Sequence, residues 1–262
     1  MDINLTGKRA IVCGSTQGIG KAAALELALL GASVTLVARN EAALQQVKTE
    51  LKTMAGQQHA SIAVDFSEPG MLKERITTYV NQSGPVHILV NNTGGPKGGQ
   101  IVDAELQEFV NTFSMHLLCN QILAQAVIPG MKMEKYGRIV DIISTSVKQP
   151  IAGLGVSNTV RGAVASWAKT LAGEVARFGI TVNNILPGMT KTGRLDYVIR
   201  MRAEREGKTV DEVMQEMIAE IPAGRYAEPR EIASVIAFLC SPAASYVNGV
   251  SLQVDGGRTT AL

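Results

Sequence analysis

Short apolar runs alternate with longer amphipathic stretches along the chain. The runs are rich in β-branched and aliphatic residues, as buried strands are, whereas the stretches repeat their apolar positions at helical spacing. The stretch from Ile19 to Leu30 is one example, and Gly31 follows it where a helix C-terminus favours glycine. The strands predicted in this way are Arg9–Cys13, Ser33–Ala38, Ser61–Val64, Val86–Val90, Arg138–Ile143, Ile180–Leu186 and Val250–Val254.

This alternation predicts an α/β protein. Near-continuous apolar strands separated by helices indicate a parallel sheet covered on both faces, and right-handed crossovers favour a doubly wound order. We therefore expect a seven-stranded, mostly parallel sheet with helices on both faces. No linker, repeat or low-complexity segment divides the sequence, so residues 1–262 are predicted to form a single domain.

Composition narrows the classes of partner. The 25 Lys and Arg against 23 Asp and Glu give a net charge of +2, which offers no strong field for nucleic acid or a membrane surface. Cys13, Cys119 and Cys240 are widely spaced in apolar runs, which is typical of core thiols in a reducing compartment. The first nine residues lack an apolar signal core. We expect a cytoplasmic protein without a metal site.

A glycine-rich turn follows the first predicted strand and opens the first helix. A bound pyrophosphate needs bare backbone N–H groups, a tight turn and a helix N-terminus that points at it. The three glycines suit the turn, the approach to the phosphates and the packing of helix on strand. Such a turn can also serve packing alone, but its strand–turn–helix context favours a dinucleotide. The predicted contact residues are Gly14, Ser15, Thr16, Gln17, Gly18, Ile19 and Gly20.

The end of the second predicted strand bears on the choice of dinucleotide. Dinucleotide folds usually place a carboxylate there for the adenosine ribose 2′-hydroxyl. Here Arg39 and Asn40 follow the strand, and a guanidinium suits a 2′-phosphate. The sequence therefore predicts NADP(H) rather than NAD(H), with Ser15, Thr16 and Asn40 as hydrogen-bonding helpers. The alternative is that Arg39 is a solvated surface arginine.

Several motifs together resemble the short-chain dehydrogenase/reductase family, in its typical-length branch. The resemblance covers Leu5 to Gly257, is most similar to 3-oxoacyl-acyl-carrier-protein reductases, and implies a Rossmann fold and an NADPH-dependent oxidoreductase. The segments that carry it are Gly14–Gly20, Asp65, Asn91-Asn92-Thr93-Gly94, Pro187-Gly188-Met189-Thr190-Lys191-Thr192 and Val254-Asp255-Gly256-Gly257.

The resemblance also implies roles for cofactor-binding residues. Asp65 matches the acid that touches adenine, with Phe66 beside it. Asn91 and Gly94 match the turn on the adenine-ribose side that stabilises the central sheet. The matching segment for the nicotinamide carboxamide consists of Pro187, Gly188 and Thr192. Helix capping and turn formation are the alternative explanations for these residue types.

The catalytic positions depart from the family pattern. The family uses an Asn, a Ser and a Tyr-x-x-x-Lys pair. Counting along the matching motifs keeps Ser144 as the serine but places Ser157 at the tyrosine, Arg161 at the lysine and His116 at the asparagine. None of the five tyrosines lies at the acid position.

These replacements change the expected chemistry. A phenol has a pKa of about 10 that a nearby ammonium can lower, whereas an aliphatic hydroxyl is far less acidic and the Ser157 side chain is shorter. Arg161 shares a helix face with Ser157 and can hold the ribose hydroxyls, but a guanidinium does not donate a proton at neutral pH. His116 is either a proton shuttle or a packed histidine. Ser144 is the remaining candidate contact to the substrate oxygen.

The region at about 189–222 resembles a substrate lid that is longer than usual. Its mixed charges are typical of a solvated face, but Lys191, Arg194 and Tyr197 could face an acidic substrate. The family resemblance also implies a homo-oligomer, a tetramer or dimer, that packs through residues 104–135 and 160–178. Val164, Trp167, Leu171 and Val175 fit either that interface or the monomer core.

Three functions remain open from the sequence. The first is an NADPH-dependent reductase of a conjugated enone, in which hydride adds to carbon, Ser144 and His116 hydrogen-bond the oxyanion and water protonates later. The second is an ordinary ketone reductase that uses His116, Tyr197 or a water as proton donor. The third is a catalytically impaired NADP(H)-binding scaffold. The predicted substrate is in either enzymatic case a small carbonyl or enone compound.

Overall fold

The computed structural model describes residues 1–261, and its centre is a seven-stranded sheet of order β3-β2-β1-β4-β5-β6-β7. Every neighbouring pair of strands is parallel. The predicted fold is confirmed, with a sheet that is parallel throughout. The strands are β1 (Arg9–Cys13), β2 (Ser33–Ala38), β3 (Ala60–Ala63), β4 (Ile88–Asn91), β5 (Gly137–Ile142), β6 (Ile180–Pro187) and β7 (Ser251–Val254).

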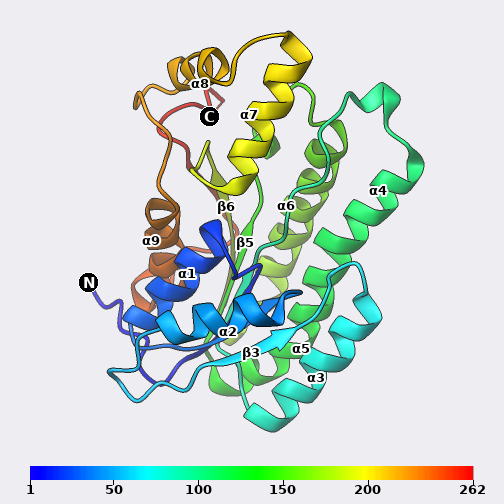
Figure 1. Ribbon diagram of the computed structural model, residues 1–262. Helices are drawn as coiled ribbons and strands as arrows, with labels where there is room; N and C mark the ends of the chain where they lie inside the picture. Colours follow the sequence, from blue (N-terminus) through cyan, green and yellow to red (C-terminus); the bar gives the residue numbers. More distant parts are fainter. Residues whose placement is uncertain (262) are drawn as a thin grey trace.

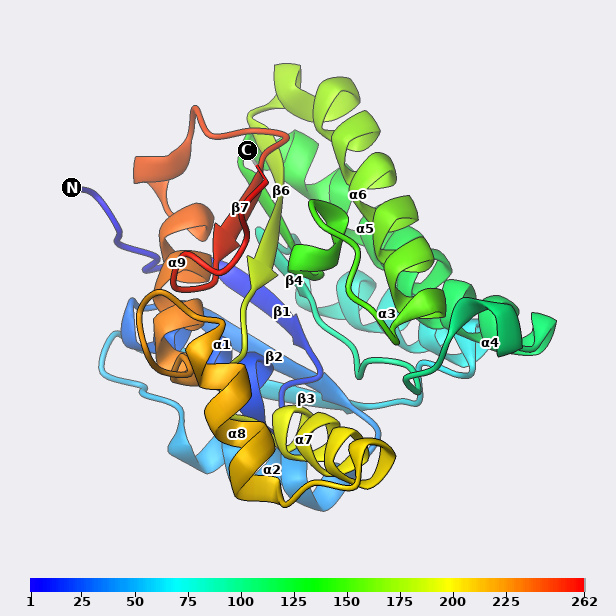
Figure 2. The ribbon, with the colours of Figure 1, turned by 90° about the horizontal axis from the view of Figure 1, so that it is seen from above.

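Helices cover both faces of the sheet (Figures 1 and 2). One layer holds α1, α2 and α9, and the other holds α3, α5 and α6, as the two large hydrophobic clusters show. This arrangement explains why the strands are apolar on both sides. The helices are α1 (Gly18–Leu29), α2 (Glu41–Glu50), α3 (Pro69–Ser83), α4 (Leu106–Phe113), α5 (Cys119–Glu134), α6 (Gly155–Val175), α7 (Gly193–Glu206), α8 (Val210–Ala219) and α9 (Pro229–Cys240).

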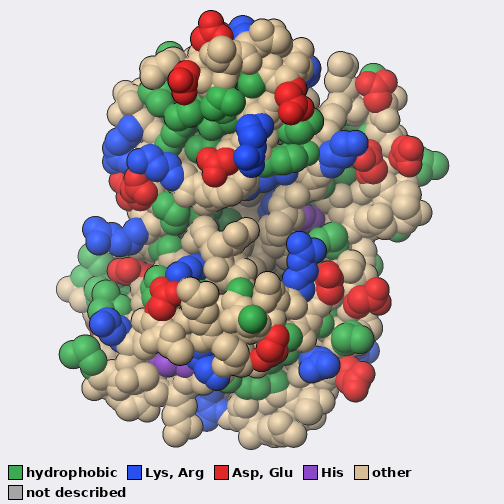
Figure 3. Space-filling view, in the orientation of Figure 1, with side chains coloured by type: hydrophobic (Ala, Val, Ile, Leu, Met, Phe, Trp, Pro, Cys, Tyr) green, Lys and Arg blue, Asp and Glu red, His purple; other side chains and the backbone are tan. Residues whose placement is uncertain are grey.

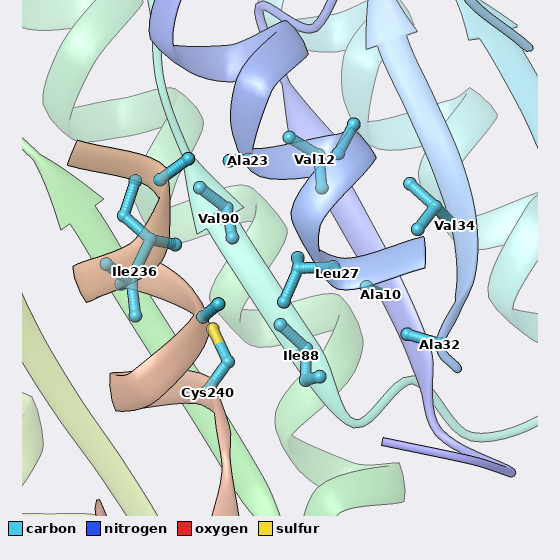
Figure 4. Packing of buried hydrophobic residues seen from close by; sticks show 14 of the residues in the cluster. Ala10, Val12, Ala23, Leu27, Ala32, Val34, Ile88, Val90, Ile236 and Cys240 are labelled. Carbon is cyan, nitrogen blue, oxygen red and sulfur yellow. The ribbon is translucent and has the colours of Figure 1, made fainter. Parts of the chain in front are cut away.

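The packing of α1 and α9 on the sheet fixes the first strand and its turn. Leu27 of α1 and Ile236 of α9 lie fully buried against Val12 and Val90, from the adjacent strands β1 and β4 (Figure 4). Burying a side chain of this kind contributes about 1.5–3 kcal/mol. The glycine turn between β1 and α1 is therefore held from both ends.

The opposite layer accounts for two of the three cysteines. Cys13 and Cys119 lie in the cluster around α3, α5 and α6, while Cys240 lies in the α1–α9 layer. All three are buried free thiols, as the sequence predicts. Burial raises the pKa of Cys119 to about 12, so this thiol stays protonated and packs as a small apolar group.

The apolar face of α6, which from the sequence fits either a subunit interface or the monomer core, lies in the monomer core. Val164 and Val175 are 1% and 4% exposed within the monomer. The indole of Trp167 donates a hydrogen bond of 2.7 Å to Gln121 of the same chain. Leu171 packs against the same internal cluster. This face of α6 thus belongs to the monomer core.

One irregular turn interrupts the helices beside the carboxyl edge of the sheet. A π-helical turn at Ser114–Leu118 separates α4 from α5. Such turns frequently mark functional positions because they displace one residue from the helical register.

Helices α7 and α8 form a separate unit with its own small core around Ile199, Val213 and Met217 (Figure 1). In residues 1–261 no helix combines the length and the apolar character needed to cross a membrane.

Candidate functional site

The strand order reverses between β1 and β4, and the loops that leave these two strands meet there. The Asn92 side-chain amide donates to the carbonyls of Cys13 and Gly14 at 3.3 and 3.2 Å. In open α/β sheets ligands bind outside the carboxyl ends of the strands at this reversal. The structure therefore places the glycine-rich turn at the binding crevice.

The glycines of the turn have distinct reasons to lack a side chain. Gly14 has a φ of 58°, and a Cβ there would lie 2.6 Å from Asn92. Gly18 has a φ of 54°, and its Cβ would lie 3.0 Å from Thr192. A Cβ on Gly20 would lie 2.2 Å from the Gly14 carbonyl oxygen. These three positions close the turn tightly on itself and on the start of α7.

Some polar groups of the turn have no hydrogen-bond partner among the described residues. The Ser15 hydroxyl is fully buried and has no hydrogen-bond partner among the described residues. Gln17, the N-cap residue of α1, makes no side-chain capping bond to the first amides of that helix. Unpaired amides at a helix N-terminus attract an anion. The groups of this turn fit an anion such as a pyrophosphate, which would satisfy them.

The end of β2 lies beside the turn, because the Gly14 amide donates to the Val37 carbonyl at 2.8 Å. Arg39 follows β2 and is exposed. The pKa of Asp65 is lowered, first by its hydrogen bonds with Ser67 and further by the positive charge of Arg39, so the two side chains are near one another. Asn40 caps α2 by accepting from the Ala43 amide. Of these three side chains, Arg39 alone carries a positive charge.

The segment after β6 closes the other end of the turn. The Gly188 amide donates to the Val254 carbonyl at 2.9 Å, and a Cβ on Gly188 would lie 2.6 Å from Asp255. Thr192 caps α7 through Leu195. The Thr192 methyl therefore reaches Gly18 from a firmly anchored segment.

His116 lies in the π-helical turn and is 3% exposed. Its Nδ1 atom lies 2.6 Å from the Thr93 hydroxyl, in the loop after β4. Burial and then the charge of Arg161 lower its pKa to about 2, although a hydrogen bond with the Gly94 backbone offsets part of this. The imidazole is therefore uncharged at neutral pH, which argues for the packed histidine and against the proton shuttle.

Arg161 lies one turn after Ser157 on α6, and each is 8% exposed. One Arg161 Nη atom donates 2.7 Å to the carbonyl of Ile142, the last residue of β5. Burial and the charge of Arg194 lower the pKa of Arg161 to about 10, so the guanidinium remains charged at neutral pH. The site thus holds a buried cation.

Ser144 stands just beyond β5 and begins a short 3-10 turn. Its Oγ atom accepts from the Ser146 amide at 3.1 Å. A hydroxyl has one donor and two acceptor sites, so this bond leaves the hydroxyl hydrogen free to donate. Ser144 is able to hydrogen-bond an oxygen that gains negative charge.

A buried acid beneath the site was not predicted from the sequence. Asp141 of β5 is fully buried and accepts from Asn91 at 2.7 Å and from Asn120 at 3.2 Å. Burial raises its pKa to about 7, although the Asn91 hydrogen bond lowers it in part. Asn91, predicted to line the cofactor, is turned toward this carboxyl. The signal for Asp141 was an acidic residue between the apolar residues Val140 and Ile142 of a predicted buried strand.

The structure gathers most of the predicted residues along one edge of the sheet, but in three groups. The first is the phosphate turn with Arg39 and Asp65. The second is Pro187–Thr192, which reaches the turn through Gly18. The third surrounds the ends of β4 and β5 and contains His116, Ser144, Ser157 and Arg161. Phe66 is 8% exposed and packs in the core, and Gly94 is exposed.

Comparisons with known proteins identify the family. A family profile described as enoyl-(acyl carrier protein) reductase matches residues 14–259. The 3-oxoacyl-acyl-carrier-protein reductase FabG of Vibrio cholerae is 33% identical over 255 residues, which cover 97% of this chain and 98% of that protein. This chain belongs to the short-chain dehydrogenase/reductase family, as the sequence motifs predict.

Solved structures agree with this assignment. L-sorbose reductase from Gluconobacter frateurii, complexed with NADPH and L-sorbose, superposes with a TM-score of 0.93 at 32% identity, covering 100% of both chains. Actinorhodin polyketide ketoreductase with NADPH gives a TM-score of 0.90 at 30% identity, covering 97% of both chains.

The buried Asp141 predicts a pH-dependent stability. The pKa of Asp141 is about 7 in the folded protein, above the unfolded value of about 4. The stability that this difference contributes is fully present below about pH 4, and it is lost as the pH rises through about 7, because the unfolded chain ionises more readily. Asp141→Asn keeps an oxygen for Asn91 and Asn120 and removes the charge. We expect its free energy of unfolding, relative to wild type, to rise by about 2–3 kcal/mol between about pH 5 and pH 8, as urea denaturation measures.

Asp211→Asn, at an exposed position of α8, is the control and should show no such rise. An Asp141→Asn difference that is the same at both pH values contradicts the prediction.

Proposed function

We propose that this protein is an NADP(H)-dependent reductase that transfers hydride to a carbonyl or conjugated enone carbon. The observation that carries the proposal is the cluster around the ends of β4 and β5. There Arg161 supplies a buried positive charge and Ser144 a free hydroxyl hydrogen, beside a glycine cradle that fits a dinucleotide. Such a cluster can stabilise a developing oxyanion.

In this proposal, most of the cofactor-binding residues are those that the sequence predicts. The phosphate turn would hold the pyrophosphate with Ser15, and Arg39 the 2′-phosphate. Thr192 would lie over the phosphates from α7, and Arg161 can reach the nicotinamide ribose. A bound reduced nicotinamide would supply the hydride. NADPH in the two structural neighbours described above supports this choice of dinucleotide.

The protein's own groups favour a reaction that needs no strong acid. Ser144 and Ser157 are aliphatic alcohols, and His116 is uncharged. These groups stabilise negative charge on a substrate oxygen but do not transfer a proton readily to it. An enolate is a weaker base than an alkoxide and can wait for a proton from water. We therefore favour reduction of a conjugated enone over that of an isolated ketone.

His116 has a positioning role in this proposal. Through Thr93 it fixes the loop after β4, and in its neutral state it adds no second positive charge beside Arg161. The loop then presents its backbone to the ligand at a constant place. The π-helical turn is what brings the imidazole toward the sheet.

The unit of α7 and α8, together with the loops around it at about 189–222, acts as the substrate lid in this proposal. Thr192 meets the phosphate turn, and Arg194 donates 2.8 Å to the Pro96 carbonyl in the loop after β4. The lid therefore contacts both sides of the crevice. Its separate small core allows it to move as a unit.

A second candidate function is an NADP(H)-binding scaffold without turnover. The observation that favours it is the burial of Arg161, Ser157 and His116, which are each less than a tenth exposed. Tight NADPH binding together with no reduction of any ketone or enone in a broad panel would support this candidate.

Arg39→Gln tests the cofactor assignment. We expect the affinity for NADPH to fall about 10- to 100-fold, because a charge-assisted hydrogen bond to phosphate is lost, while NADH affinity stays the same. Fluorescence titration measures both. Arg75→Gln, at an exposed position of α3, is the control. Wild-type protein that binds NADH as tightly as NADPH would make the assignment wrong.

Ser144→Ala tests the oxyanion role. We expect kcat/KM to fall by about 10- to 1000-fold with unchanged NADPH affinity, since one donor to the oxyanion is removed. Ser146→Ala is the matched control, because it keeps the backbone amide that Ser144 accepts from. NADPH consumption that both Ser144→Ala and His116→Ala leave intact contradicts the residue assignment.

Deuteride from labelled NADPH distinguishes the two reductions. Reduction of an enone leaves the label on the carbon β to an intact carbonyl, whereas reduction of a ketone leaves it on the carbinol carbon. Mass spectrometry and NMR of the product locate it.

We also propose a homo-oligomer, through the apolar surface of α4 and the turn before it. Ile101, Val102, Leu106 and Val110 are 53, 81, 84 and 60% exposed, and exposed apolar side chains gathered in one segment can mark an interaction surface. Sedimentation of wild type should give a dimer or tetramer, and Val110→Asp should shift it toward monomer. Met54→Asp, at a 90% exposed position elsewhere, should not. A wild-type monomer at micromolar concentration contradicts the proposal.

A further inference from the structure

Two arginine side chains converge on the substrate end of the crevice from different elements. Arg161 reaches it from α6 and Arg194 from α7. Their anchoring carbonyls belong to Ile142, the last residue of β5, and to Pro96, in the loop that follows the adjacent strand β4. Arg194 lies against Gly95 of that loop, and His116, which contacts Thr93 of the same loop, is close enough to Arg161 for the charge of Arg161 to lower its pKa. Both guanidinium groups therefore lie beside the loop after β4.

Arg194 is held in place by three different contacts. It donates to the Pro96 carbonyl at 2.8 Å. Its guanidinium lies against Gly95, where a Cβ would be 3.2 Å from the Arg194 Cζ atom. Its Cζ atom also lies 5.2 Å from the centre of the Tyr197 ring. The side chain is half-buried and does not hang into solvent as a free surface arginine would.

Arg161 has more N–H groups than its hydrogen bond within the protein uses. A guanidinium carries five N–H groups, and one of its Nη atoms is used on the Ile142 carbonyl. The side chain is 92% buried, as its 8% exposure shows. Even with the ribose as a second partner, N–H groups remain for another acceptor.

The two positive charges lack an acidic partner. Within residues 1–261 neither guanidinium takes part in an ion pair, although other arginines of the lid, such as Arg202, form several. The charges also oppose each other, because Arg194 lowers the pKa of Arg161. Figure 3 shows Lys and Arg side chains and a histidine bordering the hollow between the α7–α8 unit and the body. Keeping unpaired charges in a buried place is costly unless an anion joins them.

We propose that the substrate is a small carboxylic acid, and that its carboxylate binds between Arg161 and Arg194 while its carbonyl or enone faces Ser144. This proposal rests on the reductase function proposed above and names the class of its substrate. Guanidinium groups bind carboxylates through paired hydrogen bonds, which fix orientation as well as position.

Charge balance supports a carboxylate. Hydride addition places two electrons on the substrate carbon, the π electrons move to oxygen, and an acid substrate passes from a charge of −1 to −2. The two guanidinium groups then match the two negative charges, and a proton from water completes the product. The cofactor phosphates do not require this pair, because in the proposed function the glycine turn, Ser15 and Arg39 bind them.

A matched pair of compounds tests the proposal. trans-Acetylacrylate carries a conjugated enone and a carboxylate, and its methyl ester carries the same enone without charge. With NADPH, we expect the wild-type protein to reduce the acid with a kcat/KM about 10- to 100-fold above that of the ester, the range of a charge-assisted hydrogen bond. Arg194→Gln should remove most of this preference. Arg200→Gln, at an exposed position of the same helix, should keep it.

A binding measurement covers the case in which neither compound is turned over. Calorimetry with NADP⁺-saturated protein and levulinate, the saturated analogue, should show binding that Arg194→Gln weakens at least about tenfold. Methyl levulinate should not bind detectably. NADPH affinity, measured in parallel, should be the same in wild type and Arg194→Gln.

The outcomes separate the two proposals. Equal kcat/KM for acid and ester, or equal binding of levulinate by wild type and Arg194→Gln, overturns the carboxylate site while the reductase function stands. A loss of NADPH affinity in Arg194→Gln also overturns it, since the side chain then serves the cofactor. Absence of NADPH binding by the wild type is the result that removes the proposed function itself.

Discussion

The contact between the loops that leave β1 and β4 is the constraint on which the site depends. The chain leaves β1 toward β2 and leaves β4 toward β5, on opposite sides, so the two loop starts lie side by side, and the Asn92 side chain joins them. Gly14 and Gly20 can have no side chain there, because a Cβ on either would lie 2.6 Å or less from its neighbour. The turn that results faces the crevice with unpaired amides and a buried, unpartnered Ser15 hydroxyl. The phosphate cradle is thus a consequence of how the sheet reverses.

The same edge of the sheet carries an unusual distribution of charge. The π-helical turn, the end of β5 and the start of α6 together hold a neutral imidazole, two aliphatic hydroxyls and a buried guanidinium, without an acidic side chain to balance it. A site of this composition stabilises negative charge and has no group that gives up a proton near neutral pH. Asp141, the acid beneath β5, is turned toward amides in the interior and does not serve as the counter-charge. The proposed reaction and the proposed substrate class both follow from this excess of positive charge.

Most of the fold could be predicted from the sequence because the apolar runs of a buried parallel sheet are continuous and their ends are marked by turn residues. The bounds of β1 and β2 are those predicted, whereas those of β3 and β4 shift by one or two residues. The π-helical turn at Ser114–Leu118 was not predicted, since one inserted residue leaves the hydrophobic pattern nearly intact. Its consequence, the bond between His116 and Thr93, joins residues 23 positions apart and needs the tertiary structure.

The candidate site was only partly predictable for a similar reason. Motif spacing located Ser144, Ser157 and Arg161, because they lie on one strand end and one helix. Spacing does not tell where a long side chain ends, and so the anchoring of Arg161 on Ile142 came from the structure. Arg194 was noticed in the sequence as one of several lid cations, but only the contacts with Pro96 and Gly95 set it apart.

The most direct test of the central claim, that no side chain of the site acts as a proton donor near neutral pH, is the pH dependence of kcat/KM in wild type and His116→Asn. Because the pKa of His116 is lowered to about 2, we expect this substitution to leave the shape of the pH profile of kcat/KM unchanged between about pH 5 and pH 9. A transition near neutral pH that is present in the wild type and vanishes in His116→Asn would contradict it.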